Sequence, residues 1–237
     1  MTKTKIEWAD RTWNPITGCL HGCEYCYAKK IARRFGSLME DGILGEVASR
    51  QETSYPFGFD PTLHHYRLNE PTKIKTPQVV FVGSMADMFG NWVPDDWLKQ
   101  VLEACVSAPW HTYIFLTKNA ERLETMRLPQ NKNFWYGTTR TFDKPKFGAA
   151  GEEHNTFLSI EPLLAPPCED TLYSIDCWDW VIVGAETCRR KDKVMPKREW
   201  IKEIVDACRA ADVPVFLKDN LAEIWGEPLI QELPWRS

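Results

Sequence analysis

The sequence predicts an α/β fold, a partial TIM-like barrel of six or seven β/α units with parallel strands inside and helices outside. Short apolar runs rich in β-branched and aromatic residues recur along the chain, which is typical of parallel strands buried on both faces. Amphipathic stretches of helical periodicity lie between them. This regular alternation favours right-handed β/α units in one sheet. The apolar runs span 79–82, 112–116, 134–136, 156–160, 180–183 and 213–217.

The first unit is expected to begin with a strand near 13–17 and to continue into a helix over 27–35. Two later helices are predicted, one that opens with Pro94 and one over 196–210. Each carries an apolar stripe that can pack on the sheet. In the helix over 27–35 the predicted apolar face consists of Ala28, Ile31, Ala32 and Phe35.

Two segments lack this alternation of apolar runs and amphipathic stretches. Residues 37–76 have weak periodicity and several Gly and Pro residues, so we expect an insertion or lid there. Residues 221–237 follow the last predicted strand and are expected to close one end of the barrel. The whole chain, 1–237, is therefore predicted to form a single domain.

Composition narrows the class of protein. A chain of 237 residues with 43% hydrophobic residues can bury a full core. The N-terminus lacks the apolar region of a signal peptide, and no run approaches the roughly 18 apolar residues that span a membrane. Eight cysteines without a secretory signal indicate a reducing, cytoplasmic environment and no membrane partner. The net charge of −4 gives no overall attraction to nucleic acid.

Three cysteines stand close together near the N-terminus. Cys19, Cys23 and Cys26 have the spacing Cys-x3-Cys-x2-Cys, with Tyr25 directly before the last of them. Thiolates are the preferred ligands of iron–sulfur clusters and zinc. A closed structural site generally has four protein ligands, whereas three leave a coordination position for a substrate or cofactor. The motif therefore indicates reactive metal chemistry.

The alternative is a zinc site, with His21 or a distant residue as the fourth ligand. Zinc motifs usually contain paired Cys-x2–4-Cys units, and the chain has no second Cys-x2-Cys. A disulfide framework is less suitable, because a chain of this length and apolar content does not need one.

Polar residues follow nearly every predicted strand. In barrels of parallel strands, the carboxyl ends of the strands carry the active site. Charged groups buried there need partners or ligands. The charged residues that come directly after the apolar runs include Lys118, Glu161, Glu186 and Lys218.

The cysteine motif resembles the signature of the radical S-adenosylmethionine (SAM) superfamily. The resemblance implies a [4Fe–4S] cluster held by Cys19, Cys23 and Cys26, with SAM chelated to the fourth iron. It also implies a barrel fold and reductive cleavage of SAM to a 5′-deoxyadenosyl radical that abstracts hydrogen from a substrate. An electron donor such as flavodoxin or ferredoxin is implied as a partner.

Further runs resemble a phage-associated family of uncharacterised proteins with the same type of cysteine motif. These runs include 83–89, 116–118, 159–164 and 183–186. The sequence departs from that family in two places: Gly184-Ala185-Glu186 replaces Gly-Gly-Glu, and Lys218-Asp219-Asn220 replaces the usual Lys-Gln. The second difference puts the substrate contacts in doubt and leaves the cluster unaffected.

Chemistry and resemblance together suggest roles for the remaining residues. Tyr25 is expected beside the adenine of SAM, and Ser84 and Asp87 around its ammonium group. Lys118 or Arg140 would pair with the SAM carboxylate, and Thr138 or Glu161 would bind the ribose hydroxyls. Glu186 and Lys218 are left to face the substrate.

Other features are weaker. Cys168, Cys177 and Cys188 could hold a second cluster, although their wide spacing favours simple packing. A run of basic residues over 189–198 follows Glu186. Such a run is either solvated surface or a binding site for phosphate groups. The second alternative slightly favours a nucleotide or nucleic acid as the substrate. The rival function is a non-catalytic iron–sulfur or zinc module with a structural or sensing role.

Overall fold

The fold is described from a computed structural model, in which residues 1–36, 44–141, 149–187 and 190–235 are described. An eight-stranded sheet runs through the molecule in the order β1-β2-β6-β7-β8-β9-β10-β11. Its strands are β1 (Thr2–Lys3), β2 (Arg11–Trp13), β6 (Val79–Val82), β7 (Thr112–Thr117), β8 (Phe134–Thr139), β9 (Asn155–Ile160), β10 (Val181–Val183) and β11 (Val215–Leu217).

Every ladder of this sheet from β2 to β11 is parallel, and only β1 pairs with its neighbour antiparallel. Each of the six predicted apolar runs overlaps one of these strands. The sheet has β1 and β11 at its two edges, so the barrel is partial, as predicted.

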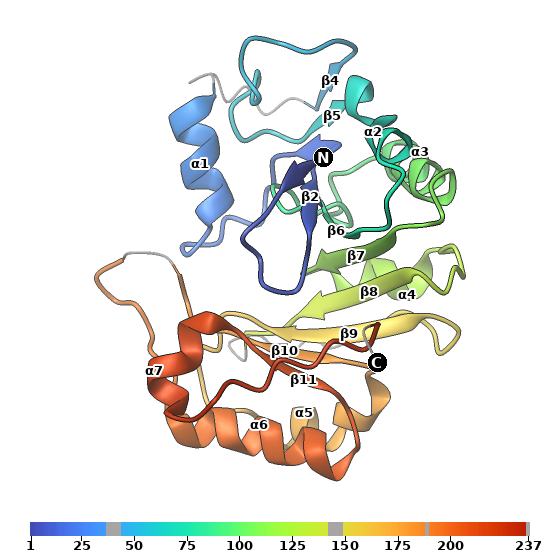
Figure 1. Cartoon of the computed structure of the whole chain (residues 1–237). Coiled ribbons are helices and arrows are strands. Elements are labelled where there is room, and N and C mark those ends of the chain that lie inside the picture. Colours follow the sequence, from blue (N-terminus) through green and yellow to red (C-terminus); the bar gives the residue numbers. More distant parts are fainter. Residues whose placement is uncertain (37–43, 142–148, 188–189, 236–237) are drawn as a thin grey trace.

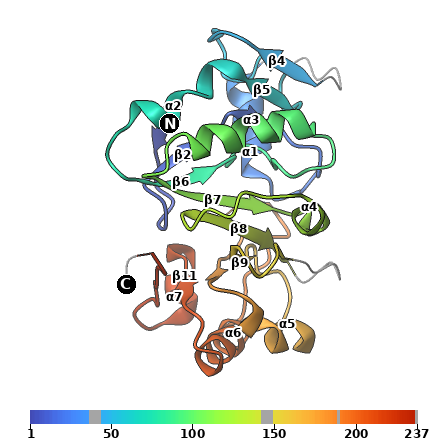
Figure 2. The same cartoon turned by 90° about the vertical axis from the view of Figure 1, so that its right-hand side faces the viewer.

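Helices cover the outer face of the sheet, as Figures 1 and 2 show from two directions. Both α3 and α6 bury an apolar stripe against the strands they follow. The α-helices are α1 (Tyr27–Phe35), α2 (Glu70–Lys73), α3 (Asp95–Val106), α4 (Ala120–Thr125), α5 (Glu169–Tyr173), α6 (Arg198–Ala210) and α7 (Ala222–Trp225). The 3-10 helices are η1 (His65–Arg67), η2 (Ile175–Cys177) and η3 (Asp219–Leu221). None of the described helices is long and apolar enough to cross a lipid bilayer.

The strand predicted near 13–17 is in fact two short strands. β2 ends at Trp13, and the chain then leaves the main sheet through Asn14-Pro15, because Pro15 has no amide hydrogen to continue a ladder. β3 (Ile16–Thr17) pairs instead with β5 (Thr62–His64), which also pairs with β4 (Gly45–Val47). Two strands of this small sheet, β4 and β5, lie in the predicted insertion, of which residues 37–43 are outside the described residues.

Strand alternation divides the core between the inside of the barrel and the space under the helices. The inner group is largely aromatic and includes Trp8, Phe81, Trp135, Phe157, Trp180 and Phe216. The C-terminal tail packs against it, with the Trp235 ring 4.8 Å from that of Trp180 and 5.4 Å from that of Trp135. The amino ends of the central strands are therefore filled by rings, and open space is left at their carboxyl ends.

The predicted inward face of α1 is partly wrong. Ala28 and Ala32 are buried, but Ile31 and Phe35 are exposed to solvent. The two alanines pack with Tyr55, Phe59 and Met85 in a small satellite core. The helical periodicity of the sequence predicted one broad apolar face, but only the part of that face formed by the two alanines packs against the neighbouring segment.

Candidate functional site

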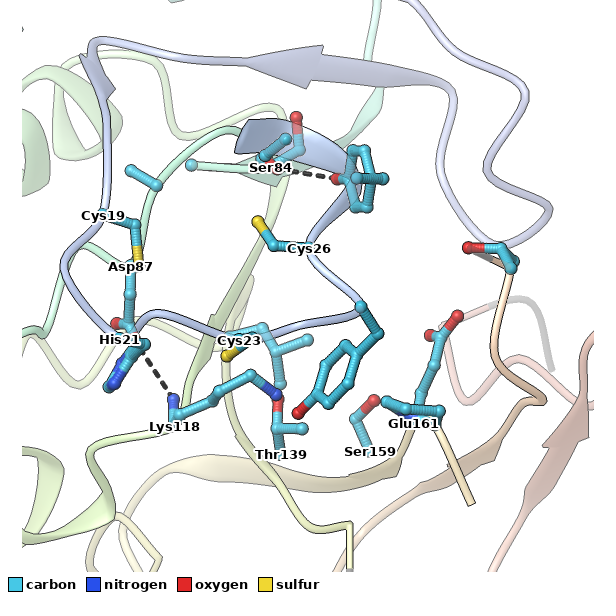
Figure 3. A pocket seen from close by; sticks show the side chains of 18 of the residues that line it. Cys19, His21, Cys23, Cys26, Ser84, Asp87, Lys118, Thr139, Ser159 and Glu161 are labelled. Atoms are coloured by element: carbon cyan, nitrogen blue, oxygen red, sulfur yellow. Dashed lines mark hydrogen bonds and ion pairs between the residues drawn. The ribbon is translucent and has the colours of Figure 1, made fainter. Parts of the chain in front are cut away.

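A cavity of about 260 Å³ opens at the carboxyl ends of the strands, inside the partial barrel. Its wall receives side chains from the cysteine loop, from the ends of several neighbouring strands and from the start of α1. Figure 3 shows the labelled side chains around this space, with the cysteines on one side and Thr139, Ser159 and Glu161 on another. The strand-end rule applied to the sequence therefore located the cavity correctly.

The three cysteines of the motif all line this cavity as free thiols. The amide of Cys19 donates to the Phe59 carbonyl, and that of Gly18 to the Met85 carbonyl, which fixes the start of the loop. Gly18 has a φ of +88°, and a Cβ there would lie 2.2 Å from the Asp60 carbonyl oxygen, so only glycine fits. The segment that contains Phe59 and Asp60, part of the predicted insertion, thus supports the cysteine loop from behind.

The end of the loop is fixed by α1. Cys26 is the N-cap residue of this helix, and its sulfur accepts a hydrogen bond from the Lys29 amide at 3.3 Å. Burial raises the pKa of Cys19 to about 12, with a further contribution from the negative charges of Asp87, Cys26 and Cys23. As thiolates these side chains would repel one another, and a cationic centre bound between them would offset that repulsion.

The donor set suits a cluster better than a single zinc ion. Among the described residues, no three His, Cys, Asp or Glu side chains are grouped closely enough to hold one metal ion. The three sulfur atoms nevertheless face one space, as a multi-iron cluster with thiolate ligands requires. His21, the fourth ligand of the zinc alternative, directs its Nε2 to Asp87 Oδ2 at 2.7 Å. These contacts make the zinc alternative the weaker interpretation.

Asp87 is fully occupied by protein donors. Its Oδ1 accepts from Thr117 Oγ1 at 2.6 Å and from the Phe89 amide at 3.1 Å. Its Oδ2 accepts from the Lys118 amide at 2.8 Å and from His21. A carboxylate has about four acceptor positions, so none remains for the ammonium group predicted from the sequence. Asp87 instead connects the cysteine loop, through His21, to Thr117 and Lys118 at the end of β7.

Lys118 extends along the cavity wall with its ammonium group 5.3 Å from the centre of the Tyr25 ring. Burial lowers its pKa, while the negative charges of Cys23, Asp87, Glu161 and Cys19 act in the opposite direction. A half-buried cation beside the cysteines and an aromatic face is suited to an anionic ligand. Of the two candidates for the SAM carboxylate, Lys118 and Arg140, Lys118 is the one that lines the cavity.

Ion pairs occupy the side of the cavity away from the cysteines. Lys218 Nζ donates to Glu161 Oε1 at 2.5 Å, and both residues line the cavity. Glu186 is buried and receives two hydrogen bonds from the guanidinium group of Arg190, at 2.7 and 3.0 Å. Arg190 also contacts Glu24 of the cysteine loop at 3.1 Å. The segment after β10 therefore meets the cysteine loop across the mouth of the cavity.

Two predicted residues do not line the cavity. Thr138 and Arg140 are buried on the outer side of β8, and Arg140 donates to Cys168 Sγ at 3.4 Å. Side chains alternate along a strand, so Thr139 faces the cavity instead. The sequence analysis had the correct strand end but the wrong register.

Sequence reasoning also missed Trp8 and Ser159, which line the cavity and are almost fully buried. Ser159 could have been found, because it stands two residues before Glu161 on the same strand face. Trp8 lies in an irregular segment before β2, and no periodic signal marks it. Tyr25 and Ser84, which the sequence analysis assigned to SAM, both line the cavity, and Ser84 Oγ is hydrogen-bonded to Asn14 Oδ1 at 3.1 Å.

The proposed second cluster gains no support from the described residues. Cys168 and Cys177 are exposed and do not line the cavity, while Cys188 and Arg189 lie outside the described residues. The Cys168 thiol bonds to Thr171 and to Arg140, which makes it part of the start of α5. Cys105 and Cys208 lie on the buried faces of α3 and α6.

Comparison with known proteins gives two matches. The sequence matches a family described as "Protein of unknown function (DUF5131)" over residues 3–229. The fold is similar to that of a cysteine-to-serine mutant of spore photoproduct lyase, with a TM-score of 0.52 and 10% sequence identity, over 91% of this chain and 78% of that one. No curated protein matches the sequence significantly.

Proposed function

We propose a function from the site itself, because the chain belongs to the DUF5131 family, whose description assigns none. In this proposal the protein is a radical SAM enzyme. The observation that carries it is the group of three free cysteine thiols that line one cavity at the carboxyl ends of a partial parallel barrel. The similarity to spore photoproduct lyase at the level of the fold supports the same choice.

Cys19, Cys23 and Cys26 would hold a [4Fe–4S] cluster, with one iron left for SAM. When reduced, such a cluster supplies one electron that divides SAM into methionine and a 5′-deoxyadenosyl radical, which takes a hydrogen atom from the substrate. The protein's own residues would exclude water from the site and orient the reactants. The aromatic floor of Trp8 and Phe81 excludes water from the cavity.

Lys118 is assigned to the SAM carboxylate, because its half-buried ammonium group lies beside the cysteines. Tyr25 offers a ring face beside this cation, which suits the adenine of SAM or its sulfonium. Ser84 keeps the ammonium-binding role, since its hydroxyl oxygen can still accept a hydrogen bond. Asp87 is reassigned to hold the cysteine loop through His21.

Thr139 replaces Thr138 as a candidate for the ribose hydroxyls, together with Glu161. Lys218 and Glu186 are assigned to the substrate, as predicted from the sequence. Both form ion pairs at the side of the cavity away from the cysteines, and those pairs can exchange partners when a polar ligand enters. A nucleotide or nucleic acid is the favoured substrate class, because basic residues follow Glu186 towards α6.

Anaerobic reconstitution with iron and sulfide tests this proposal. The protein should bind about four irons, become brown and form 5′-deoxyadenosine from SAM when a strong reductant is added. A Cys23→Ser variant should lose both properties. Tight binding of one zinc ion, without iron uptake or 5′-deoxyadenosine, would favour the non-catalytic metal module instead.

A further inference from the structure

Helix α1 presents an apolar stripe to solvent. Tyr27, Ile31 and Phe35 follow each other at intervals of four residues and are 46%, 38% and 59% exposed. Residues at this spacing form one continuous ridge along a helix. The buried side chains of α1 are those of Ala28 and Ala32, which pack against Tyr55, Phe59 and Met85. Figure 1 shows α1 standing at the flank of the molecule. A contiguous exposed ridge of this kind marks an interaction surface.

Positive charge accompanies this ridge. Lys30 and Arg34 form a parallel row on one side of it, and α1 contains no acidic residue. With Lys29 and Arg33, the helix has four basic residues in a chain whose net charge is −4. An interface of apolar contacts with a basic rim is complementary to a protein surface with an acidic rim.

The ridge begins at the cysteine site. Tyr27 directly follows Cys26, lines the cavity, and donates its hydroxyl hydrogen to the Ser84 carbonyl at 2.6 Å. Leu20, in the loop between Cys19 and His21, is also exposed. A protein seated on α1 would therefore lie next to the cysteine loop.

We propose that the Tyr27–Ile31–Phe35 ridge and its basic flank form the docking site for an acidic, flavin-carrying electron carrier of the flavodoxin class. This inference rests on the proposed function. In the step that it serves, one electron leaves the reduced flavin of the carrier and enters the cysteine-bound cluster. The carrier is oxidised by one electron and the cluster is reduced by one, and no covalent bond forms. The ridge would contact the apolar edge of the flavin, and the basic residues the acids around it.

A nucleic acid fits this face less well. Bases could stack on Tyr27, Phe35 and Arg34, but Ile31 and Leu20 add aliphatic surface that offers no such stacking. Redox encounters, in contrast, use small interfaces that are steered by charge. A patch of one helix beside the cysteine loop has the extent that such an encounter needs.

The test uses the reconstituted protein and a reduced flavodoxin, with a Lys30→Glu, Arg34→Glu, Phe35→Ser variant. Its matched control is Lys99→Glu, Lys202→Glu, which reverses exposed charges on α3 and α6. Flavodoxin affinity is measured by calorimetry, and reduction of the cluster by stopped-flow absorbance and electron paramagnetic resonance. In the ridge variant we expect both affinity and reduction rate to fall about tenfold, while reduction by dithionite stays unchanged. The control should behave as the wild type does.

Equal flavodoxin binding and equal reduction rates in the ridge variant and the wild type would overturn the inference. So would loss of affinity for a single-stranded oligonucleotide in place of flavodoxin. A wild-type reduction rate that does not fall as ionic strength rises would also contradict it, and this measurement needs no substitution. If the wild-type protein forms no cluster that dithionite can reduce, the proposed function fails first and the docking inference with it.

Discussion

The two sides of the cavity are organised by different interactions. On the cysteine side, a single carboxylate, that of Asp87, accepts four hydrogen bonds from His21, Thr117 and two backbone amides. On the far side, half-buried ion pairs join Lys218 to Glu161 and Arg190 to Glu186. The first arrangement has no spare acceptor, while in the second Lys218, Glu161 and Glu186 line the cavity and can change partners.

This difference indicates a division of labour. A fully satisfied buried carboxylate is costly to disturb, because each donor that loses it is left unpaired. Ion pairs with partial solvent access are cheaper to rearrange. The cysteine side is therefore suited to hold a fixed metal centre, and the far side is suited to admit a ligand that varies during a reaction.

Among changes that test this difference between the two sides of the cavity, removal of a cysteine should have the largest effect. We expect Cys26→Ser to lower the iron content after reconstitution by about tenfold or more, because a ligand is lost. Cys177→Ser is the matched control, since that thiol is exposed and does not line the cavity. Iron analysis of both variants checks the expectation, which fails if the two lose iron equally.

Substitution of the organising carboxylate should have the next largest effect. Asp87→Ala leaves several buried donors unpaired, so the free energy of unfolding of the metal-free protein should fall by about 3 kcal/mol. Iron uptake should fall as well, because His21 no longer holds the cysteine loop. Urea unfolding and iron analysis measure these effects, with Asp96→Ala on exposed α3 as the control. Normal iron content with weakened SAM binding would return Asp87 to the ammonium role expected from the sequence.

On the far side, Lys218→Met should spare the metal centre. The substitution leaves Glu161 without its partner, and we expect the affinity for SAM or substrate to change by about tenfold, equivalent to ~1.4 kcal/mol. Iron content should remain that of the wild type. Calorimetric titration with SAM, combined with Glu161→Gln in a double-mutant cycle, measures the coupling of the pair. A fall in iron content would show that the two sides are not independent.

The smallest expected effect distinguishes two neighbouring threonines. Thr139→Val removes a hydroxyl that faces the cavity and should weaken SAM binding about fivefold, the equivalent of one hydrogen bond of ~1 kcal/mol. Thr138→Val, on the opposite face of β8, should leave the affinity unchanged. If the order of the two effects is reversed, the register of β8 assigned to the site is wrong.

Much of the fold could be predicted from local sequence. The apolar runs located the strands from β6 to β11, and the strand-end rule brought Lys118, Glu161, Glu186 and Lys218 to one cavity. The errors share one origin, because they concern which side of an element faces which neighbour. Thr138 and Arg140 were expected at the site but lie on the face of the strand away from the cavity. Ile31 and Phe35 were expected on the packed face of α1 but are exposed to solvent.

The sequence by itself determined the chemistry that is available: three closely spaced thiols and a charged residue after most strands, since residue type and spacing are local properties. Only the tertiary structure decided how those groups are used. Asp87 is saturated because two distant parts of the chain, His21 and the adjacent Thr117 and Lys118, meet it only in the folded protein. The α1 ridge is exposed for the same reason, because burial depends on the neighbour that packs against a face and not on the face alone.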